Sequence, residues 1–73
     1  MLKGKEMVKL TCELNVRAIN AMLRMKGMLG VYAYYADNKY ARIVHAFTRK
    51  GVLYAREING DVITGLTAVH AEI

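Results

Sequence analysis

Apolar-rich runs make up most of residues 29 to 69, and turn-forming residues interrupt them at three places. The runs between these turns are rich in Val, Ile, Tyr and Phe, which are the residue types that strands favour. This pattern predicts four strands, at about 30–36, 40–48, 52–58 and 62–69. Because only short turns separate them, the four strands are expected to form an antiparallel meander.

The three turns predict how neighbouring strands are aligned. Asn59-Gly60 is the strongest hairpin signal in the chain, and Asp37-Asn38-Lys39 and Arg49-Lys50-Gly51 are weaker versions of it. If each turn is a two-residue loop, the alignment of the strands follows directly. The predicted opposite pairs then include Tyr34 with Ile43, His45 with Arg56, Phe47 with Tyr54, and Arg56 with Ile63.

This alignment divides the predicted sheet into an aromatic face and an aliphatic face. The aromatic face comprises Tyr32, Tyr34, Ile43, His45, Phe47, Tyr54, Arg56, Ile58, Ile63 and Val69. The aliphatic face comprises Val31, Ala33, Tyr35, Arg42, Val44, Ala46, Leu53, Ala55, Glu57, Val62, Leu66 and Ala68. Neither face is predominantly polar, so we expect both faces to be covered, since large exposed apolar patches mark interaction sites.

The segment before the meander has two interpretations. Residues 8–16 alternate strictly between apolar and polar types, which favours a strand followed by a helix that begins at Val16, with Asn15 as its N-cap. Arg17, Asn20 and Arg24 then form a polar stripe on that helix, and Gly27 follows its end. The alternative starts the helix near Lys5, which leaves residues 7–15 open between strand and helix.

Both interpretations give the α+β fold class. We predict one helix packed on a mainly antiparallel four- or five-stranded meander sheet, with the order β-α-β-β-β-β in the favoured interpretation. The 73 residues form a single domain, 1–73. One helix covers only one face of such a sheet, so a homodimer is expected, formed either by stacking of the sheets or by pairing of edge strands. A small closed barrel, which would hide one face inside, is the alternative.

Catalytic chemistry has little support in the sequence. Cys12, His45 and His70 lie on separate predicted elements without the spacing of a zinc site, and Cys12 falls on the apolar side of its strand. No glycine-rich phosphate loop is present. We therefore predict a non-enzymatic protein with no catalytic residues, no metal site and no cofactor.

Charge indicates an anionic partner. The net charge is +5 and the isoelectric point is about 9.6, which favours attraction to nucleic acid. The residues predicted to contact phosphate are Arg17, Arg24, Lys39, Arg49 and Lys50. A second candidate surface, which either stacks on bases or forms the dimer interface, consists of Tyr32, Tyr34, His45, Phe47, Tyr54 and Arg56.

Together these patterns predict a small basic binding protein, oligomeric, that binds nucleic acid or regulates a nucleic-acid process. The alternative is a protein–protein interaction module, such as a small inhibitor or adaptor, that acts through an apolar sheet face or edge. No membrane-spanning segment and no signal peptide is evident in the sequence, so no membrane association and a cytoplasmic location are expected.

Overall fold

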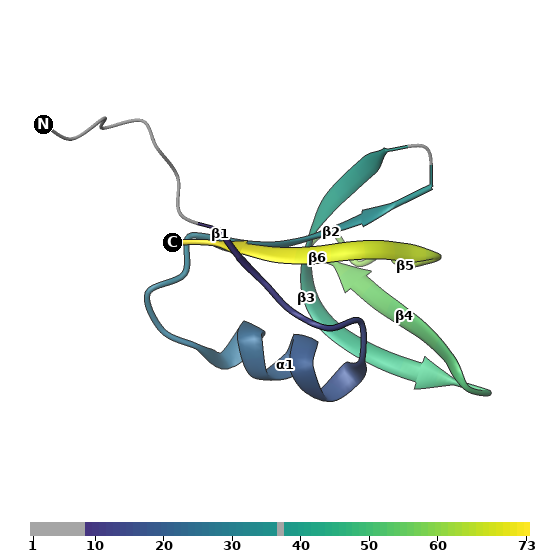
Figure 1. Cartoon of the computed structure of the whole chain (residues 1–73). Coiled ribbons are helices and arrows are strands. Elements are labelled where there is room, and N and C mark those ends of the chain that lie inside the picture. Colours follow the sequence, from purple (N-terminus) through teal and green to yellow (C-terminus); the bar gives the residue numbers. More distant parts are fainter. Residues whose placement is uncertain (1–8, 37) are drawn as a thin grey trace, which may run out of the picture.

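The computed structural model describes residues 9–36 and 38–73 (Figure 1). Its elements are β1 (Lys9–Thr11), α1 (Val16–Arg24), β2 (Gly30–Tyr35), β3 (Lys39–Arg49), β4 (Val52–Glu57), β5 (Val62–Thr64) and β6 (Leu66–Glu72). The strands form one antiparallel sheet in the order β1-β6-β2-β3-β4-β5. The predicted α+β class and the meander are confirmed. The sheet has six strands rather than four or five because the predicted strand at 62–69 is divided in two.

Gly65 makes this division and turns the chain through a corner. Its φ of +72° lies in the left-handed region, which glycine adopts without steric cost. Before Gly65, β5 pairs with β4, and after it, β6 pairs with β2 and β1. The chain therefore passes from one part of the sheet to another at a single residue.

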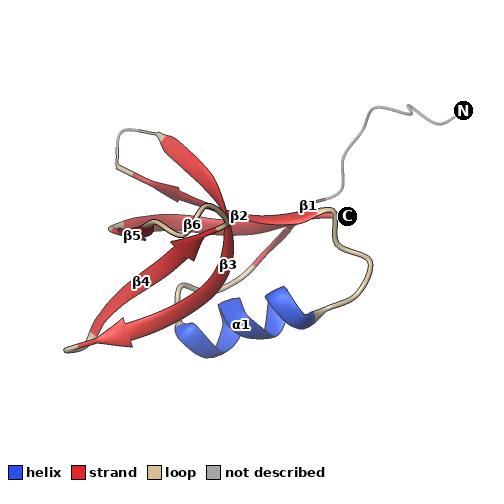
Figure 2. Ribbon diagram, turned by 180° about the vertical axis from the view of Figure 1, so that it is seen from behind, coloured by secondary structure: helices blue, strands red, loops and turns tan. Residues whose placement is uncertain are grey.

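β3 makes a second corner at the opposite side of the sheet. Its first residues, up to Arg42, pair with β2, whereas the residues from Ile43 onward pair with β4. The alignment with β4 shifts between Ile43 and His45, which leaves Val44 as the extra residue of a β-bulge. Figure 2 shows β3 curving between β2 and β4. With corners at Val44 and Gly65, the sheet folds into two layers, as strands that change layer through bulges or bends allow.

The core lies between these two layers and the helix. Its buried residues are Ile19 and Met22 of α1, and Val31, Ala33, Ile43, Ala46, Ala55, Ile63, Val69 and Ala71 of the strands. Four of these ten residues are alanine, and such small side chains let two sheet layers approach each other. The inner face of the sheet is thus covered by the chain itself, without a second copy. We call the opposite face of the sheet the outer face.

The alignment of β3 with β4 agrees with the sequence prediction. Lys50 (φ +54°) and Gly51 (φ +77°) form a two-residue turn in which both residues have positive φ. His45 accordingly lies opposite Arg56, and Phe47 lies opposite Tyr54.

The other two turns are longer than predicted, and this changes the alignment. Tyr35 lies opposite Lys39, which leaves a three-residue loop and places Tyr34 opposite Tyr40 rather than Ile43. At the Asn59-Gly60 turn, the N–H of Glu57 donates to the carbonyl of Asp61 (2.7 Å), which again encloses three residues. Arg56 therefore lies opposite Val62 rather than Ile63. A three-residue loop with glycine at its last position is the next commonest hairpin connection.

These shifts correct the predicted faces. Three residues assigned to the aromatic face are buried in the core instead, namely Ile43, Ile63 and Val69. Three residues assigned to the aliphatic face lie opposite outer-face residues instead, namely Arg42, Val62 and Ala68. At the turn before β3, the alignment is shifted by an odd number of residues, which alone would exchange the two faces of β3. His45 and Phe47 keep their predicted face because the extra residue at the Val44 bulge exchanges the faces again.

The interpretation with a strand before the helix is confirmed. The Asn15 side chain caps α1, with its Oδ1 accepting from the N–H of Ala18 at 2.8 Å. β1 is shorter than the alternation predicts, since it ends at Thr11 and Leu14 is 41% exposed. The helix ends at Arg24, and Gly27 (φ +86°) lies in the connection that follows.

Asn20 is not part of a solvent-facing stripe, in contrast to the prediction. Its Oδ1 accepts from the N–H of Ala46 and its Nδ2 donates to the carbonyl of Ala46, both at 2.9 Å. β2 no longer pairs with β3 at this point, so the Asn20 amide occupies the place of a neighbouring strand. Arg17 and Arg24, on the same helix, are exposed.

Replacing Asn20 with Ala should destabilise the protein. The change leaves the N–H and carbonyl of Ala46 without partners in a partly buried position, which costs about 2 kcal/mol of unfolding free energy. Urea denaturation followed by circular dichroism measures this loss. Arg17→Ala, on the exposed side of the same helix, is the matched control and should stay within about 0.5 kcal/mol of the unaltered protein. Equal stabilities of the two variants would contradict the role of Asn20.

Candidate nucleic-acid interface

Four aromatic rings from three strands gather on the outer face. Tyr32 and Tyr34 of β2 each contact the ring of His70 on β6, with centroid distances of 5.8 and 5.4 Å. On the other side, Tyr40 of β3 lies 6.0 Å from Tyr32 and 5.4 Å from Tyr34. We call these four residues the tyrosine cluster. Spacings of this size are typical of attractive ring–ring packing.

The tyrosine cluster has a buried base and an exposed rim. His70 is only 7% exposed, because it lies on β6 between Thr11 of β1 and Tyr32 of β2. Its Nε2 is 3.8 Å from a carboxylate oxygen of Glu72. Tyr40, in contrast, is 61% exposed. The cluster therefore presents ring surface to the solvent from a fixed support.

Gly30 allows Tyr32 to take its place in this cluster. A Cβ atom at position 30 would lie 3.0 Å from Cε1 and 3.1 Å from Oη of Tyr32. The tyrosine ring thus lies directly over the glycine backbone, and a larger residue at position 30 would displace it.

A second ring cluster lies farther along β3. Phe47 stacks on Tyr54 of β4, with centroids 5.5 Å apart and planes within 12°, and His45 stacks on Phe47 at 6.2 Å. The guanidinium carbon of Arg56 lies 6.0 Å from the Phe47 ring centre, which is within cation–π range. Arg56 also donates from Nη1 to the carbonyl of Gly60 at 3.3 Å. We call His45, Phe47, Tyr54 and Arg56 the phenylalanine cluster.

All six residues of the predicted aromatic surface lie on the outer face, but they divide between the two clusters. Tyr32 and Tyr34 belong to the tyrosine cluster, and the other four form the phenylalanine cluster. Sequence reasoning did not include Tyr40, Arg42 or His70 in this surface. The correct loop length before β3 would have indicated Tyr40 and Arg42, because they are two positions apart on the same face of β3 and lie opposite Tyr34 and Tyr32.

The five basic residues predicted to contact phosphate are separated by the fold. Arg17 and Arg24 lie on α1, Lys39 begins β3, and Arg49 and Lys50 lie at its far end. The ends of the 11-residue β3 pair with different strands, Lys39 with Tyr35 of β2 and Arg49 with Val52 of β4. All five residues are exposed. They do not converge on one site.

Arginines do accompany the rings on the outer face. Arg42 lies opposite Tyr32, Arg56 belongs to the phenylalanine cluster, and Arg49 lies two positions beyond Phe47 on the same side of β3. Among the described strand residues that pairing and alternation assign to this face, Glu72 is the only acid, and it lies next to His70. The outer face therefore combines exposed rings with an excess of positive charge.

Other kinds of site find no support in the described part of the chain. Residues 9–36 and 38–73 contain no group of three or more His, Cys, Asp or Glu side chains that could hold a metal ion. Within the same ranges, no helix is long and apolar enough to cross a membrane. Cys12 is half-buried and unpaired, and burial together with the neighbouring Glu13 raises the pKa of its thiol.

Comparisons with protein-family models, with curated proteins and with solved structures found no significant match to this chain.

The raised pKa of Cys12 predicts slow reaction with alkylating reagents. A higher pKa lowers the thiolate fraction at neutral pH, and the thiolate is the reacting species. The rate of iodoacetamide labelling should therefore rise with pH around a midpoint above that of the same chain unfolded in urea. Glu13→Gln should move the midpoint only part of the way down, because burial is the larger cause. A folded-state midpoint at or below the unfolded one would contradict this expectation.

Proposed function

We propose that this protein is a small, basic, non-enzymatic binding protein whose outer face holds single-stranded nucleic acid. Bases would stack on the tyrosine cluster and on the phenylalanine cluster, and Arg42, Arg49 and Arg56 would contact phosphates. Ring platforms with adjacent cations are a common way for sheets to bind unpaired strands. The observation that carries the proposal is the position of both clusters on a solvent-facing sheet surface.

The exposure of these rings favours a binding role over a core role. The core between the layers is complete without them, since its buried residues come from the inner face and α1. An antiparallel sheet with one face on a core usually carries polar residues on the other face. Here that face carries Tyr40 at 61% exposure and exposed His45 instead. A surface of exposed and half-buried rings is expected where a ligand or partner covers it.

Aromatic rings, rather than charge, favour the outer face over the helix as the nucleic-acid surface. Arg17 and Arg24 of α1 are exposed, but in the described structure no aromatic ring pair involves a helix residue. Phosphate contacts alone would give weak, sequence-independent binding. The outer face offers stacking in addition, and Arg56 is already positioned by its hydrogen bond to Gly60.

A protein–protein interaction module remains the alternative, and exposed apolar side chains favour it. Leu29 is 63% exposed and Ile58 is 60% exposed, and neither belongs to a ring cluster. The edge strands β1 and β5 each pair on one side only. An edge of this kind can accept a strand from another protein or from a second copy.

Binding of a fluorescein-labelled oligonucleotide of about 12 nucleotides tests the proposal, with fluorescence anisotropy as the measurement. We expect binding at low salt that weakens with a slope of about −2 in log affinity against log salt, as three arginine contacts to a single strand predict. Tyr40→Ala should weaken binding about tenfold, which corresponds to the loss of one stacked base.

Two pairs of variants make this test specific. Leu29→Ala removes an apolar side chain of similar exposure outside the clusters and should leave affinity unchanged. Arg56→Gln should weaken binding more than Arg17→Gln, although both remove one positive charge. If the two arginine variants are equivalent, contacts on the outer face do not explain the affinity. If neither RNA nor DNA binds at low salt, the proposal is wrong.

The predicted homodimer has a separate test. We expect a solution mass of twice the 8.2 kDa of one chain, formed through an edge strand so that the outer face stays free. Light scattering should then give the same mass for Tyr40→Asp as for the unaltered protein. If Tyr40→Asp halves the mass, the outer face is the dimer interface, and the nucleic-acid proposal loses its site. A monomeric unaltered protein would contradict the dimer itself.

A further inference from the structure

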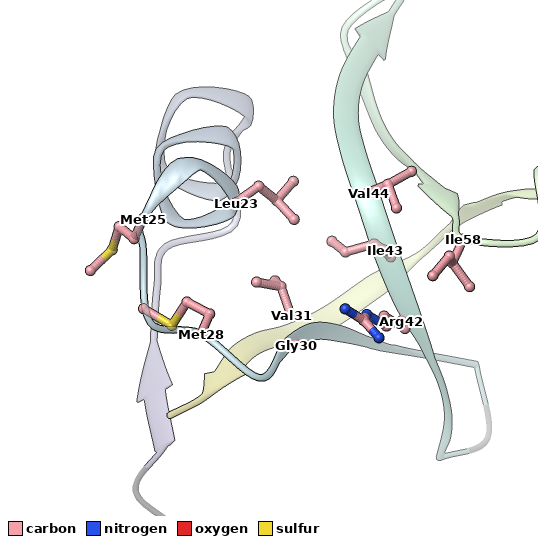
Figure 3. Close-up of a pocket in the computed structure, with 9 residues that line it drawn as sticks. All are labelled: Leu23, Met25, Met28, Gly30, Val31, Arg42, Ile43, Val44 and Ile58. Carbon is pink, nitrogen blue, oxygen red and sulfur yellow. The ribbon is translucent and has the colours of Figure 1, made fainter.

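A cleft of about 260 Å³ lies where β2 and β3 separate below the end of α1 (Figure 3). The two strands stop pairing at Tyr32 and Arg42, because β3 turns away at the bulge. The beginning of β2 is therefore left without a neighbour on that side. The helix end and the connection after it form the remaining wall, and they do not fill the gap.

The wall of this cleft combines apolar side chains with one charged group. Leu23, Met28 and Val31 line one side, and Val44 and Ile58 line the other (Figure 3). Ile58 is 60% exposed and Val44 is 46% exposed, so apolar surface reaches the solvent at this opening. Methionine side chains such as that of Met28 adapt readily to the shape of a small apolar ligand.

Arg42 is the only charged residue in the lining. Figure 3 draws its guanidinium on the side of β3 towards Val31. Within the described part of the chain, the single ion pair joins His70 and Glu72, and Arg42 has no carboxylate partner there. A guanidinium presents a planar set of donors that matches a carboxylate in a bidentate arrangement.

We propose that this cleft binds a small amphipathic anion, with its carboxylate on Arg42 and its short hydrocarbon tail against Leu23, Met28 and Ile58. The volume of about 260 Å³ is slightly below the range of most ligand pockets, which span about 300–1,000 Å³. It therefore suits a small ligand with a short hydrocarbon tail. The charge of Arg42 selects the anionic head, and the apolar wall selects the tail.

This site is distinct from the ring clusters. The ring of Tyr32 lies over Gly30, and Gly30 lines the cleft, so the tyrosine forms the boundary between the cleft and the outer face. No ring of either cluster lines the cleft. The cleft shares Arg42 with the proposed nucleic-acid surface, so a small anion and a phosphate would compete for this guanidinium. The cleft proposal nevertheless goes beyond nucleic-acid binding and does not depend on it.

Titration of the full chain with octanoate, followed by two-dimensional NMR of ¹⁵N-labelled protein, tests the inference. We expect saturable shifts at the amides of Val31, Val44 and Ile58. Octanol, which has the same tail without the charge, should bind roughly tenfold more weakly, as the loss of a charge-assisted contact predicts. Equal affinity for octanol would overturn the assignment of an anion, and the absence of saturable shifts would overturn the site.

Variants separate the contact with Arg42 from general charge effects. Arg42→Gln should weaken octanoate binding roughly tenfold and bring it to the level of octanol. Arg17→Gln removes the same charge from the helix surface and should have no effect on octanoate. Ile58→Asp, at an exposed position, should block the apolar wall and repel the carboxylate. If Arg42→Gln and Arg17→Gln give the same affinity, the inference is wrong.

Discussion

The pair of hydrogen bonds between the Asn20 side chain and the backbone of Ala46 is the constraint on which the fold depends. A strand in a sheet interior needs partners along both edges, and unpaired backbone groups in buried positions are costly. β3 has β2 on one edge only for its first residues. The helix supplies the missing partner through one amide, and the same contact fixes α1 over the core beside Ile19 and Met22. β3 is thereby free to bend away from β2 without leaving Ala46 unsatisfied.

This bend, together with the corner at Gly65, explains how so small a chain covers one of its two apolar faces. The sheet closes over four alanines and a few larger aliphatic side chains, and α1 closes the remaining side. The inner face then needs no second subunit. What is left is an outer face that is more aromatic than a solvated sheet surface should be, so the question of function concentrates on that face and on the cleft beside it.

Local patterns in the sequence predict the strands and the helix well, because alternation and the Asn15 cap act within a few residues. They predict alignment less well, since one residue more in a loop exchanges the two faces of a strand. The Asn59-Gly60 turn has the strongest hairpin signal, yet it encloses three residues rather than two. His45 and Phe47 were placed on the correct face only because the bulge at Val44 offset an earlier shift. His70 could not be placed at all, because its partners on β2 are more than 30 residues away in the chain and no local pattern indicates such a pairing.

The bulge at Val44 also gives the outer face its shape. Because the core lies inside the bend of β3, the surface that carries both ring clusters is convex, and the clusters are tilted away from each other. A polymer that contacts both clusters has to curve around this surface. Double-stranded DNA is stiff over about 150 base pairs and resists curvature on the scale of one small domain, whereas an unpaired strand follows it freely. The bend of β3 would thus favour binding of a flexible, unpaired nucleic-acid chain over binding of a duplex, before any base is recognised.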